Sequence, residues 1–365
     1  MTTNTKQDIN NFLDLFLNDI PMMDVRASVE FNHGSFPNTV NLPLLNDQER
    51  ADVGTTYKQQ GKDEAVALGH RLVQGDIKAE RVKLWAEFAR QNPNGCLFCF
   101  RGGMRSHIVQ EWLREAGVDY PLIEGGYKKV RRFLIDSLDE IVEKEKFIVI
   151  SGRTGVGKTI VINSLPNSVD LEGLANHRGS SFGRKVDDQP TQINFENSLA
   201  IKLLKITQKP SCTIFVEDES STIGKCSLPL TLFEKMKAAP VIVLEDSLEN
   251  RIEAIKKEYV TDMCNSYKSV YGDESFGKFS EYLLLSLDRV KRRLGLDNHK
   301  TINLLMTEAL AAQEKTNDTS LHSAWISSLL INYYDPMYDY QLSHKSDRVV
   351  FKGTKDDILQ YCSSN

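Results

Sequence analysis

The chain has 365 residues, of which 41% are hydrophobic and 26% charged, so it is neither a disordered polymer nor a fibre. This length is enough for two domains, each with its own core. The formal net charge of −5 excludes a chain that is basic throughout, but it leaves room for a local basic surface that binds nucleic acid. Six cysteines at irregular spacing favour reduced thiols over a disulfide framework.

The hydrophobic residues are spread along the chain, and no apolar run approaches the roughly 20 residues that cross a bilayer. The N-terminal segment has one lysine, three aspartates and no cleavage-type site of small residues, so it does not resemble a signal peptide. The sequence therefore predicts a cytoplasmic protein that does not associate with membranes.

The first part of the chain alternates short strand candidates with helical segments. Strands are expected at 22–26, 39–44, 96–100 and 120–125, and helices at 63–73, 78–91 and 105–116. This alternation predicts a parallel sheet covered by helices. A charged helical segment at 128–146 ends in a polar run, and we place a domain boundary near residue 140, with a helical insertion at 44–94 inside the first domain, 1–140.

A second α/β pattern follows this boundary. Strands are expected at 147–150, 213–217 and 240–245, and helices at 158–164 and 191–207, which together make a domain over 141–246. From 247 to 365 we expect a mainly helical region, because apolar residues recur at three- and four-residue spacing in 248–263, 275–294, 299–315 and 320–331. The tyrosine-rich tail from 332 is expected to pack as a terminal segment.

A glycine loop follows the strand at 147–150 and matches G-x-x-x-x-G-K-[ST] at every fixed position. Its glycines let backbone N–H groups surround a phosphate chain, its lysine supplies a positive charge, and its threonine can hold Mg²⁺. The motif predicts a phosphate site but does not name the group attached to the phosphates, and ATP is one candidate. The residues concerned are Gly152, Gly155, Gly157, Lys158 and Thr159.

The strand at 213–217 ends in acids, and Glu217 or Asp218 could support the same Mg²⁺. The alternative is a solvated strand end. No cysteine or histidine group has zinc-ligand spacing, so a structural metal is not expected.

A second loop begins with Cys99 at the end of the strand at 96–100 and opens a helix. A thiolate there faces backbone donors and a helix N-terminus, which favour the charged form of a nucleophile. Arg101 and Arg105 can fork onto a tetrahedral oxyanion. The alternative for Cys99 is a buried small hydrophobe. Cys96 has C-x-x-C spacing with Cys99, but we interpret it as a core residue.

Several segments resemble known families. DVR at 24–26, with the segment at 30–43, is similar to the opening of a rhodanese domain, and EGGY at 124–127 resembles its closing motif. A rhodanese with this cysteine loop, fused to a P-loop domain, resembles the tRNA 2-selenouridine synthase family over essentially the whole chain. The segments 64–73 and 171–180 also resemble that family. We therefore expect an α/β fold with an N-terminal rhodanese-like parallel-sheet domain, then a P-loop α/β domain with a helical C-terminal part.

This resemblance implies a reaction in which selenium from selenophosphate replaces the sulfur of 2-thiouridine at the tRNA wobble position. It also implies transfer of a geranyl group from geranyl diphosphate to that sulfur beforehand. In this hypothesis Gly152–Thr159 bind the diphosphate instead of a nucleotide. Cys99 accepts or relays selenium, while Arg101 and Arg105 orient selenophosphate. A selenophosphate-producing enzyme is a further candidate partner.

Two alternatives stay open. Cys99 and Arg105 are separated by five residues, one more than in ordinary rhodaneses, and this is also the spacing of cysteine phosphatases. The runner-up is therefore a cysteine-dependent phosphatase or sulfurtransferase gated by a P-loop ATPase domain. The third reading is a tRNA-binding or regulatory module whose cysteine loop only senses anions.

The remaining candidates are polar residues near the family-like segments and basic clusters. Substrate orientation is assigned to Gly69, His70, Arg71, His177 and Arg178, each of which could instead be structural. The basic clusters are candidate tRNA contacts, although a solvated helix face is the alternative for each. They comprise Lys128, Lys129, Arg131, Arg132, Lys256, Lys257, Lys291, Arg292 and Arg293.

Overall fold

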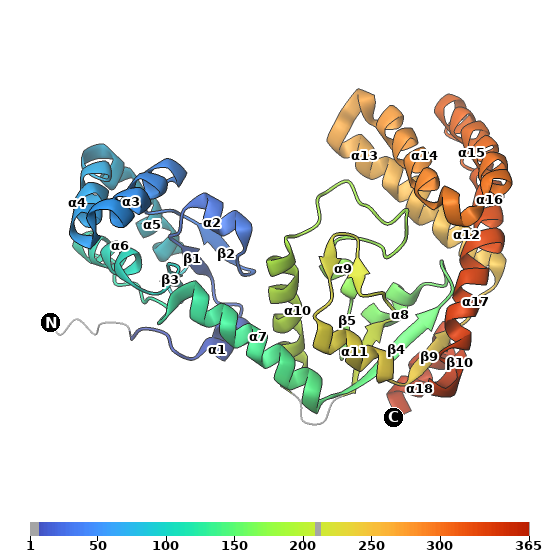
Figure 1. The fold of residues 1–365 in the computed structure, drawn as a ribbon, viewed down its shortest axis with the longest axis horizontal. Helices are drawn as coiled ribbons and strands as arrows, with labels where there is room; N and C mark the ends of the chain where they lie inside the picture. Colours follow the sequence, from blue (N-terminus) through green and yellow to red (C-terminus); the bar gives the residue numbers. More distant parts are fainter. Residues whose placement is uncertain (1–6, 209–212, 365) are drawn as a thin grey trace. The chain divides into compact units, whose positions relative to one another are not determined.

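A computed structural model describes residues 7–208 and 213–364 (Figure 1). The chain divides into two compact units, Met1–Ile141 with Thr191–Gln208, and Val142–Pro190 with Lys209–Asn365. Each unit contains a parallel sheet, and the second also has a large helical part. The predicted fold class is thus confirmed. The first division falls next to residue 140, where the sequence places the boundary.

The sheet of the first unit has three short parallel strands. β1 (Met22–Asp24) lies between β2 (Thr39–Asn41) and β3 (Cys96–Phe98). The prediction of a fourth strand at 120–125 was wrong, because this segment makes only isolated bridges, Leu122 with Leu97 and Ile123 with Ile9. Pro121 has no N–H to donate, and a helix begins at Gly126, so little extended chain remains to pair.

Helices surround this sheet, and the insertion supplies α3 (Asp47–Gln60), α4 (Lys62–Leu72) and α5 (Gly75–Gln91) (Figure 1). The expected helices appear as α4, α5, α6 (Met104–Glu115) and α7 (Gly126–Lys144). Three others are α1 (Phe12–Leu17), α2 (Ser28–His33) and α3. Asn46 caps α3 by accepting from the Glu49 N–H. None of the fourteen residues of α3 is buried, so it has no apolar stripe by which sequence reasoning could find it.

α10 (Gln192–Ile206) is the helix expected at 191–207, but it packs in the first unit and not with the P-loop sheet unit. Polar side chains fix it there. Asn194 Oδ1 accepts from the Ser35 N–H at 2.7 Å, and Asn197 Nδ2 donates to the Ser35 carbonyl at 2.7 Å. Lys205 adds an ion pair with Asp19 at 2.6 Å.

The sheet of the second unit has five parallel strands in the order β10-β9-β4-β6-β5. They are β4 (Lys146–Gly152), β5 (Ser168–Val169), β6 (Thr213–Glu217), β9 (Val241–Leu244) and β10 (Val349–Gly353). The helices of this layer are α8 (Lys158–Ser164), α9 (Leu171–Leu174) and α11 (Leu230–Ala238). A small hairpin of β7 (Thr222–Ile223) and β8 (Cys226–Ser227) turns at Gly224, whose φ is 61°.

The helical part of the second unit has its own core, which includes Phe279, Leu287 and Trp325. It comprises α12 (Leu248–Ile255), α13 (Met263–Tyr271), α14 (Ser275–Leu294), α15 (Leu296–Thr316), α16 (His322–Leu329) and α17 (Asp335–Ser343). π-helical turns at Lys256–Asp262 and Leu330–Tyr334 join α12 to α13 and α16 to α17.

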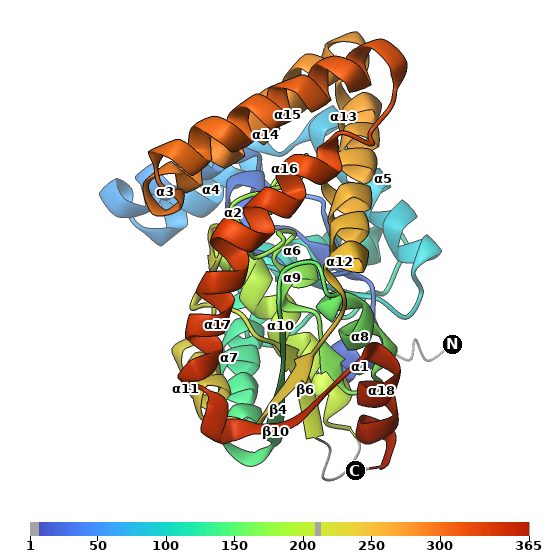
Figure 2. The same ribbon diagram turned by 90° about the vertical axis from the view of Figure 1, so that its right-hand side faces the viewer.

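The tail does not end as a simple packed segment. After α17 it returns to the sheet, where β10 pairs with β9 and α18 (Lys355–Ser364) follows (Figure 2). Ile358 of α18 is buried with Ile242 and Leu244 of β9. The region 247–365 is therefore helical only in part. In the described residues, no helix has both the length and the apolar character to cross a membrane.

Candidate functional site

The cysteine loop connects β3 to α6 and is hydrogen-bonded to the first turn of α7. The Tyr127 N–H donates to the Cys99 carbonyl, and the Lys128 N–H donates to the Phe100 carbonyl, both at 2.9 Å. Gly126 has a φ of 58°, and a Cβ there would lie 2.3 Å from the Cys99 carbonyl oxygen. Gly126 of the EGGY segment is therefore required for α7 to hold this loop.

The Cys99 side chain is 3% exposed, and its sulfur lies 3.2 Å from Ser106 Oγ. Ser106 Oγ is also 2.9 Å from the Gly103 carbonyl, to which it can donate instead. A hydroxyl that donates to sulfur stabilises a thiolate. Ser106 received no role from the sequence, although it directly follows Arg105. Cys96 is fully buried, and burial raises the pKa of its thiol, in agreement with a core role.

An ion pair with Glu30 fixes the orientation of the Arg105 side chain. Its Nη1 and Nη2 atoms donate to the two Glu30 carboxylate oxygens at 2.7 and 3.2 Å. Burial opposes ionisation of Glu30, but Arg105, together with Arg50, still lowers the pKa of this carboxyl. Glu30 thus orients Arg105 and offsets part of its charge. Arg101 is exposed.

The phosphate loop of the second unit follows β4. Gly155 and Gly157 have φ values of 85° and 84°, so both need the freedom of glycine. Gly152 lies close to β9, since a Cβ would lie 2.8 Å from the Leu244 carbonyl oxygen. Lys158 begins α8 and donates from Nζ to the Gly152 carbonyl at 3.1 Å.

Three acids lie near this loop, of which Glu217 is buried and Glu172 and Glu219 are partly buried. Thr159 donates to Glu217 Oε1 at 3.0 Å, and the Glu172 N–H donates to Glu217 Oε2 at 3.1 Å. The carboxylates of Glu172 and Glu219 converge at Gly179, where a Cβ would lie 2.7 and 2.6 Å from their oxygens. Burial and the charge of Glu172 raise the pKa of Glu217 to about 8 and that of Glu219 to about 9.

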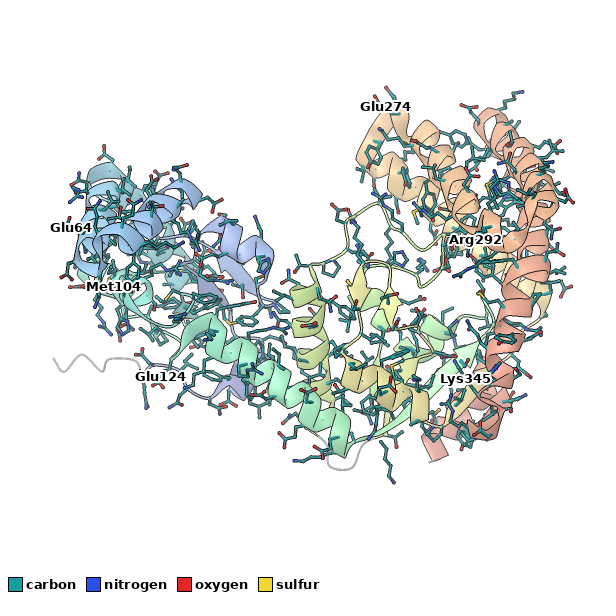
Figure 3. The ribbon with its side chains drawn as sticks, viewed as in Figure 1. Glu64, Met104, Glu124, Glu274, Arg292 and Lys345 are labelled. Carbon is teal, nitrogen blue, oxygen red and sulfur yellow. The ribbon has the colours of Figure 1, made fainter. Side chains whose placement is uncertain are left out.

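Asp218, the second acid considered for Mg²⁺, is bound to the side chains of Lys345 and Ser151. Both of its oxygens contact Lys345 Nζ, at 2.6 and 2.7 Å, and Oδ2 also accepts from Ser151 Oγ at 2.6 Å. Lys345 comes just after α17 (Figure 3). Of the two acids, Glu217 is the one that contacts Thr159. Among the described residues, no cluster of three or more His, Cys, Asp or Glu side chains is arranged to hold a metal.

The match to known proteins covers both loops. A family model described as "tRNA 2-selenouridine synthase AAA domain" matches residues 145–365. Proteins named "tRNA 2-selenouridine synthase" from Marinobacter nauticus, Pseudomonas fluorescens and Pseudomonas syringae pv. tomato are 50%, 49% and 52% identical to this chain. The alignments cover 99%, 97% and 97% of this chain and 98%, 97% and 97% of those proteins.

The chain belongs to the tRNA 2-selenouridine synthase family. The resemblance found from the sequence is thus confirmed. The matched residues 145–365 extend through the tail strand β10, as expected if the tail is part of the P-loop unit.

The two segments that resemble the tRNA 2-selenouridine synthase family lie in different units. Gly69, His70 and Arg71 lie near the end of α4, where Arg71 is exposed and the His70 ring is 6.0 Å from the Trp112 ring. Arg178 forms an ion pair with Glu258. His177 Nδ1 is buried without a hydrogen-bond partner in the part of the chain that the structure describes, and burial, with Arg289 and Lys185, lowers the pKa of this histidine.

The candidate tRNA contacts of this family member differ in exposure. Arg131 bonds to Asn197 at 2.8 Å and pairs with Glu196, and Lys256 pairs with Glu253 at 2.7 Å, so both have structural partners. Lys257 is paired with Asp262 at 3.7 Å, and Arg132 with Asp136 at 3.5 Å. Lys128 and Lys129 are exposed, as are Lys291, Arg292 and Arg293 in the last turn of α14. Figure 3 labels Arg292.

Proposed function

We propose that this protein converts 2-thiouridine at the tRNA wobble position into 2-selenouridine with selenophosphate, through an S-geranyl-2-thiouridine made from geranyl diphosphate. Membership of the tRNA 2-selenouridine synthase family supports the overall reaction. The observation that carries the two-step scheme is the presence of two separate anion loops, a complete P-loop and a cysteine loop with the Ser106 hydroxyl beside its thiol. Each loop serves one step.

The first step is an alkylation. The sulfur of 2-thiouridine attacks carbon 1 of the geranyl group, a C–S bond forms, and the C–O bond to the diphosphate breaks. The diphosphate leaves with the bonding electrons, and the nucleoside loses its N3 proton. The loop amides at the start of α8 and Lys158 stabilise the charge that develops on this leaving group. This chemistry supports geranyl diphosphate over a nucleotide at Gly152–Thr159.

The residues beside the P-loop fit Mg²⁺. Mg²⁺ usually takes one or two protein oxygens, with waters and substrate phosphates completing its shell. Thr159 and Glu217 are the residues that would hold it, and the raised pKa of Glu217 indicates a buried acid group that lacks a neutralising charge. When bound, the ion neutralises charge on the leaving diphosphate.

The second step uses Cys99. Relay of selenium as an S–Se bond would expel phosphorus as phosphite, a reduced product, so we place the attack at phosphorus. The Cys99 thiolate attacks selenophosphate, an S–P bond forms, the P–Se bond breaks, and hydrogen selenide leaves with the electron pair. Water then hydrolyses the phosphocysteine to phosphate and free thiol. Phosphorus keeps its oxidation state throughout.

The released selenide completes the exchange. It adds to C2 of the S-geranyl nucleoside, a C–Se bond forms, the C–S bond breaks, and geranylthiol leaves with a proton. S-alkylation makes this departure easier than the departure of sulfide. Arg105, held by Glu30, and the exposed Arg101 orient the selenophosphate oxyanions. An enzyme that makes selenophosphate would supply this co-substrate.

A second candidate is a cysteine-dependent phosphatase, favoured by the same five-residue spacing and by the Ser106 contact. Mass spectrometry of nucleosides from tRNA incubated with geranyl diphosphate and selenophosphate tests both. The native protein should make 2-selenouridine, a Cys99→Ser protein should stop at S-geranyl-2-thiouridine, and a Lys158→Ala protein should make neither. Phosphate release from phosphomonoesters without tRNA products would favour the phosphatase instead.

A further inference from the structure

The first unit contains a cavity of about 470 Å³ that neither anion loop uses. Its walls come from α3, α4 and α6, which lie together in Figure 1. Its apolar lining includes Val53 and Tyr57 of α3, Val66 of α4, and Ile108 and Trp112 of α6. The volume lies within the roughly 300–1,000 Å³ of sites that enclose small organic ligands.

The cavity explains an anomaly in α3. A packed helix buries an apolar face, but α3 buries none of its fourteen residues, and Tyr57 is 60% exposed. Protein interiors are normally close-packed, so an apolar space of this size leaves the side of its walls that faces the space without contacts. A hydrocarbon ligand would supply those contacts to α3.

The polar residues around the cavity are cations or potential cations. Lys62, His70 and Arg105 line it together with the apolar side chains. Arg105 and Met104 belong to the first turn of α6, which directly follows the Cys99 loop. A ligand with an apolar chain inside and its reacting end at Arg105 would therefore present that end to the cysteine loop.

We propose that this cavity binds the geranyl chain of S-geranyl-2-thiouridine while the Cys99 loop delivers selenium to C2. The inference rests on the proposed function, since that function supplies a substrate with an apolar chain on the sulfur to be replaced. It adds the place where the chain is held, a cavity lined by residues of the first unit.

Gly69 provides a way to fill the cavity without damaging the fold. It lines the cavity within α4, and a Cβ on it would meet only Val53 Cγ2, at 3.9 Å. Replacing a glycine inside a helix also removes a conformational cost. Gly54 in α3 is the matched control, because it is also helical, has nothing within 4 Å of a Cβ, and does not line the cavity.

The test uses geraniol, which has the chain but neither diphosphate nor nucleoside. Calorimetric titration of the full chain should show binding to the native protein and to Gly54→Leu, with affinity weaker by about tenfold or more in Gly69→Leu. Hydrogen exchange of α3 should slow when geraniol is added to the native protein, and it should not change in Gly69→Leu. Absence of geraniol binding to the native protein, or equal affinity in Gly69→Leu, overturns the inference.

A second measurement separates this inference from the proposed function. With synthetic S-geranyl RNA and selenophosphate, Gly69→Leu should raise KM by about tenfold or more and Gly54→Leu should not. If the native protein makes 2-selenouridine from S-geranyl RNA but does not bind geraniol, the cavity assignment fails and the function stands. If geraniol binds at the cavity but no S-geranyl RNA is consumed, the proposed function fails and the cavity remains a hydrocarbon site.

Discussion

The Ser106 hydroxyl lies 3.2 Å from the Cys99 sulfur and 2.9 Å from the Gly103 carbonyl oxygen. One hydroxyl has one proton, so it can serve only one of these acceptors at a time. When Cys99 is neutral the carbonyl is the better acceptor, and when Cys99 is a thiolate the charged sulfur competes for the proton. The Ser106 hydroxyl can therefore change its hydrogen-bond acceptor according to the charge of Cys99, without a large movement of the side chain.

Ser106→Ala should slow selenation and leave geranylation intact. A hydrogen bond to a charged group contributes about 1.5–3 kcal/mol, so the rate of 2-selenouridine formation should fall by about 10- to 100-fold. Single-turnover kinetics with S-geranyl RNA measure this. Ser106→Thr keeps the hydroxyl and is expected to retain part of the rate. An equal loss in both chemical steps would show that Ser106 is only structural.

Glu30→Gln should destabilise the protein in a pH-dependent manner. Arg105 keeps the Glu30 pKa below its usual value, so this carboxylate adds stability above the unfolded pKa near 4.5, and the gain is lost as pH falls through the lower, folded-state pKa. Urea unfolding at pH 7 should show a loss of about 1–2 kcal/mol, and the difference from the native protein should shrink toward pH 4. A difference that is constant with pH would contradict the ion pair. Glu111→Gln, at an exposed position, is the control.

Lys158→Met should remove diphosphate binding. Loss of a phosphate-binding lysine at a preorganised loop should weaken affinity for inorganic diphosphate by about 100-fold. Isothermal titration in the presence of Mg²⁺ measures it. Lys146→Met, at the exposed start of β4, is the matched control and should bind as the native protein does. Unchanged affinity in Lys158→Met would remove the P-loop from this role.

Glu219→Gln should stabilise the protein at high pH. Burial, with the charge of Glu172, raises the pKa of Glu219 to about 9, so between pH 4.5 and 9 the folded state holds a proton that the unfolded state releases. Stability therefore falls as pH rises through this window, and the glutamine removes that cost. The melting temperature should rise by about 2–6 °C at pH 9 and change little at pH 5. Glu234→Gln, exposed on α11, should show neither effect, and an equal shift at both pH values would refute the explanation.

Charge reversal at Lys291, Arg292 and Arg293 should weaken tRNA binding. These side chains are exposed on the last turn of α14, and each lost phosphate contact lowers the slope of log affinity against log salt by about 0.7–0.9. Filter binding across a salt series measures that slope. Reversal at Lys237, Lys256 and Lys278, which pair with Glu234, Glu253 and Glu274, changes net charge equally and should affect the slope less. The same slope in both triple variants would exclude the α14 cluster.

The features that depend on local sequence pattern were predicted from the sequence. The strand-loop-helix contexts of Gly152–Thr159 and Cys99–Ser106 are each formed by consecutive residues. Each loop follows the predicted strand and precedes the predicted helix. The partners of these loops come from distant segments. Glu30 reaches Arg105 from 75 residues away and Lys345 reaches Asp218 from 127 residues away, and no periodicity encodes either contact.

Elements were missed where local signals are weak. α3 has no apolar stripe, because its few hydrophobic side chains are only partly buried or exposed: Val53 packs against the core, and Val53 and Tyr57 line the cavity. β10 is a short edge strand whose partner β9 lies about a hundred residues earlier, so its role depends on tertiary pairing. α10 was predicted as a helix, but its place in the first unit depends on its asparagines, which bond to Ser35 far away in the sequence, and the helical pattern does not encode that contact.

The position of β10 has a consequence for synthesis on the ribosome. Until β10 emerges, the edge of β9 that lies opposite β4 is bare, with unpaired N–H and C=O groups. The nascent P-loop unit therefore cannot complete its sheet before β10 has been synthesised. A stop codon introduced just before Val349 would leave a product with this edge unpaired and prone to edge-to-edge association.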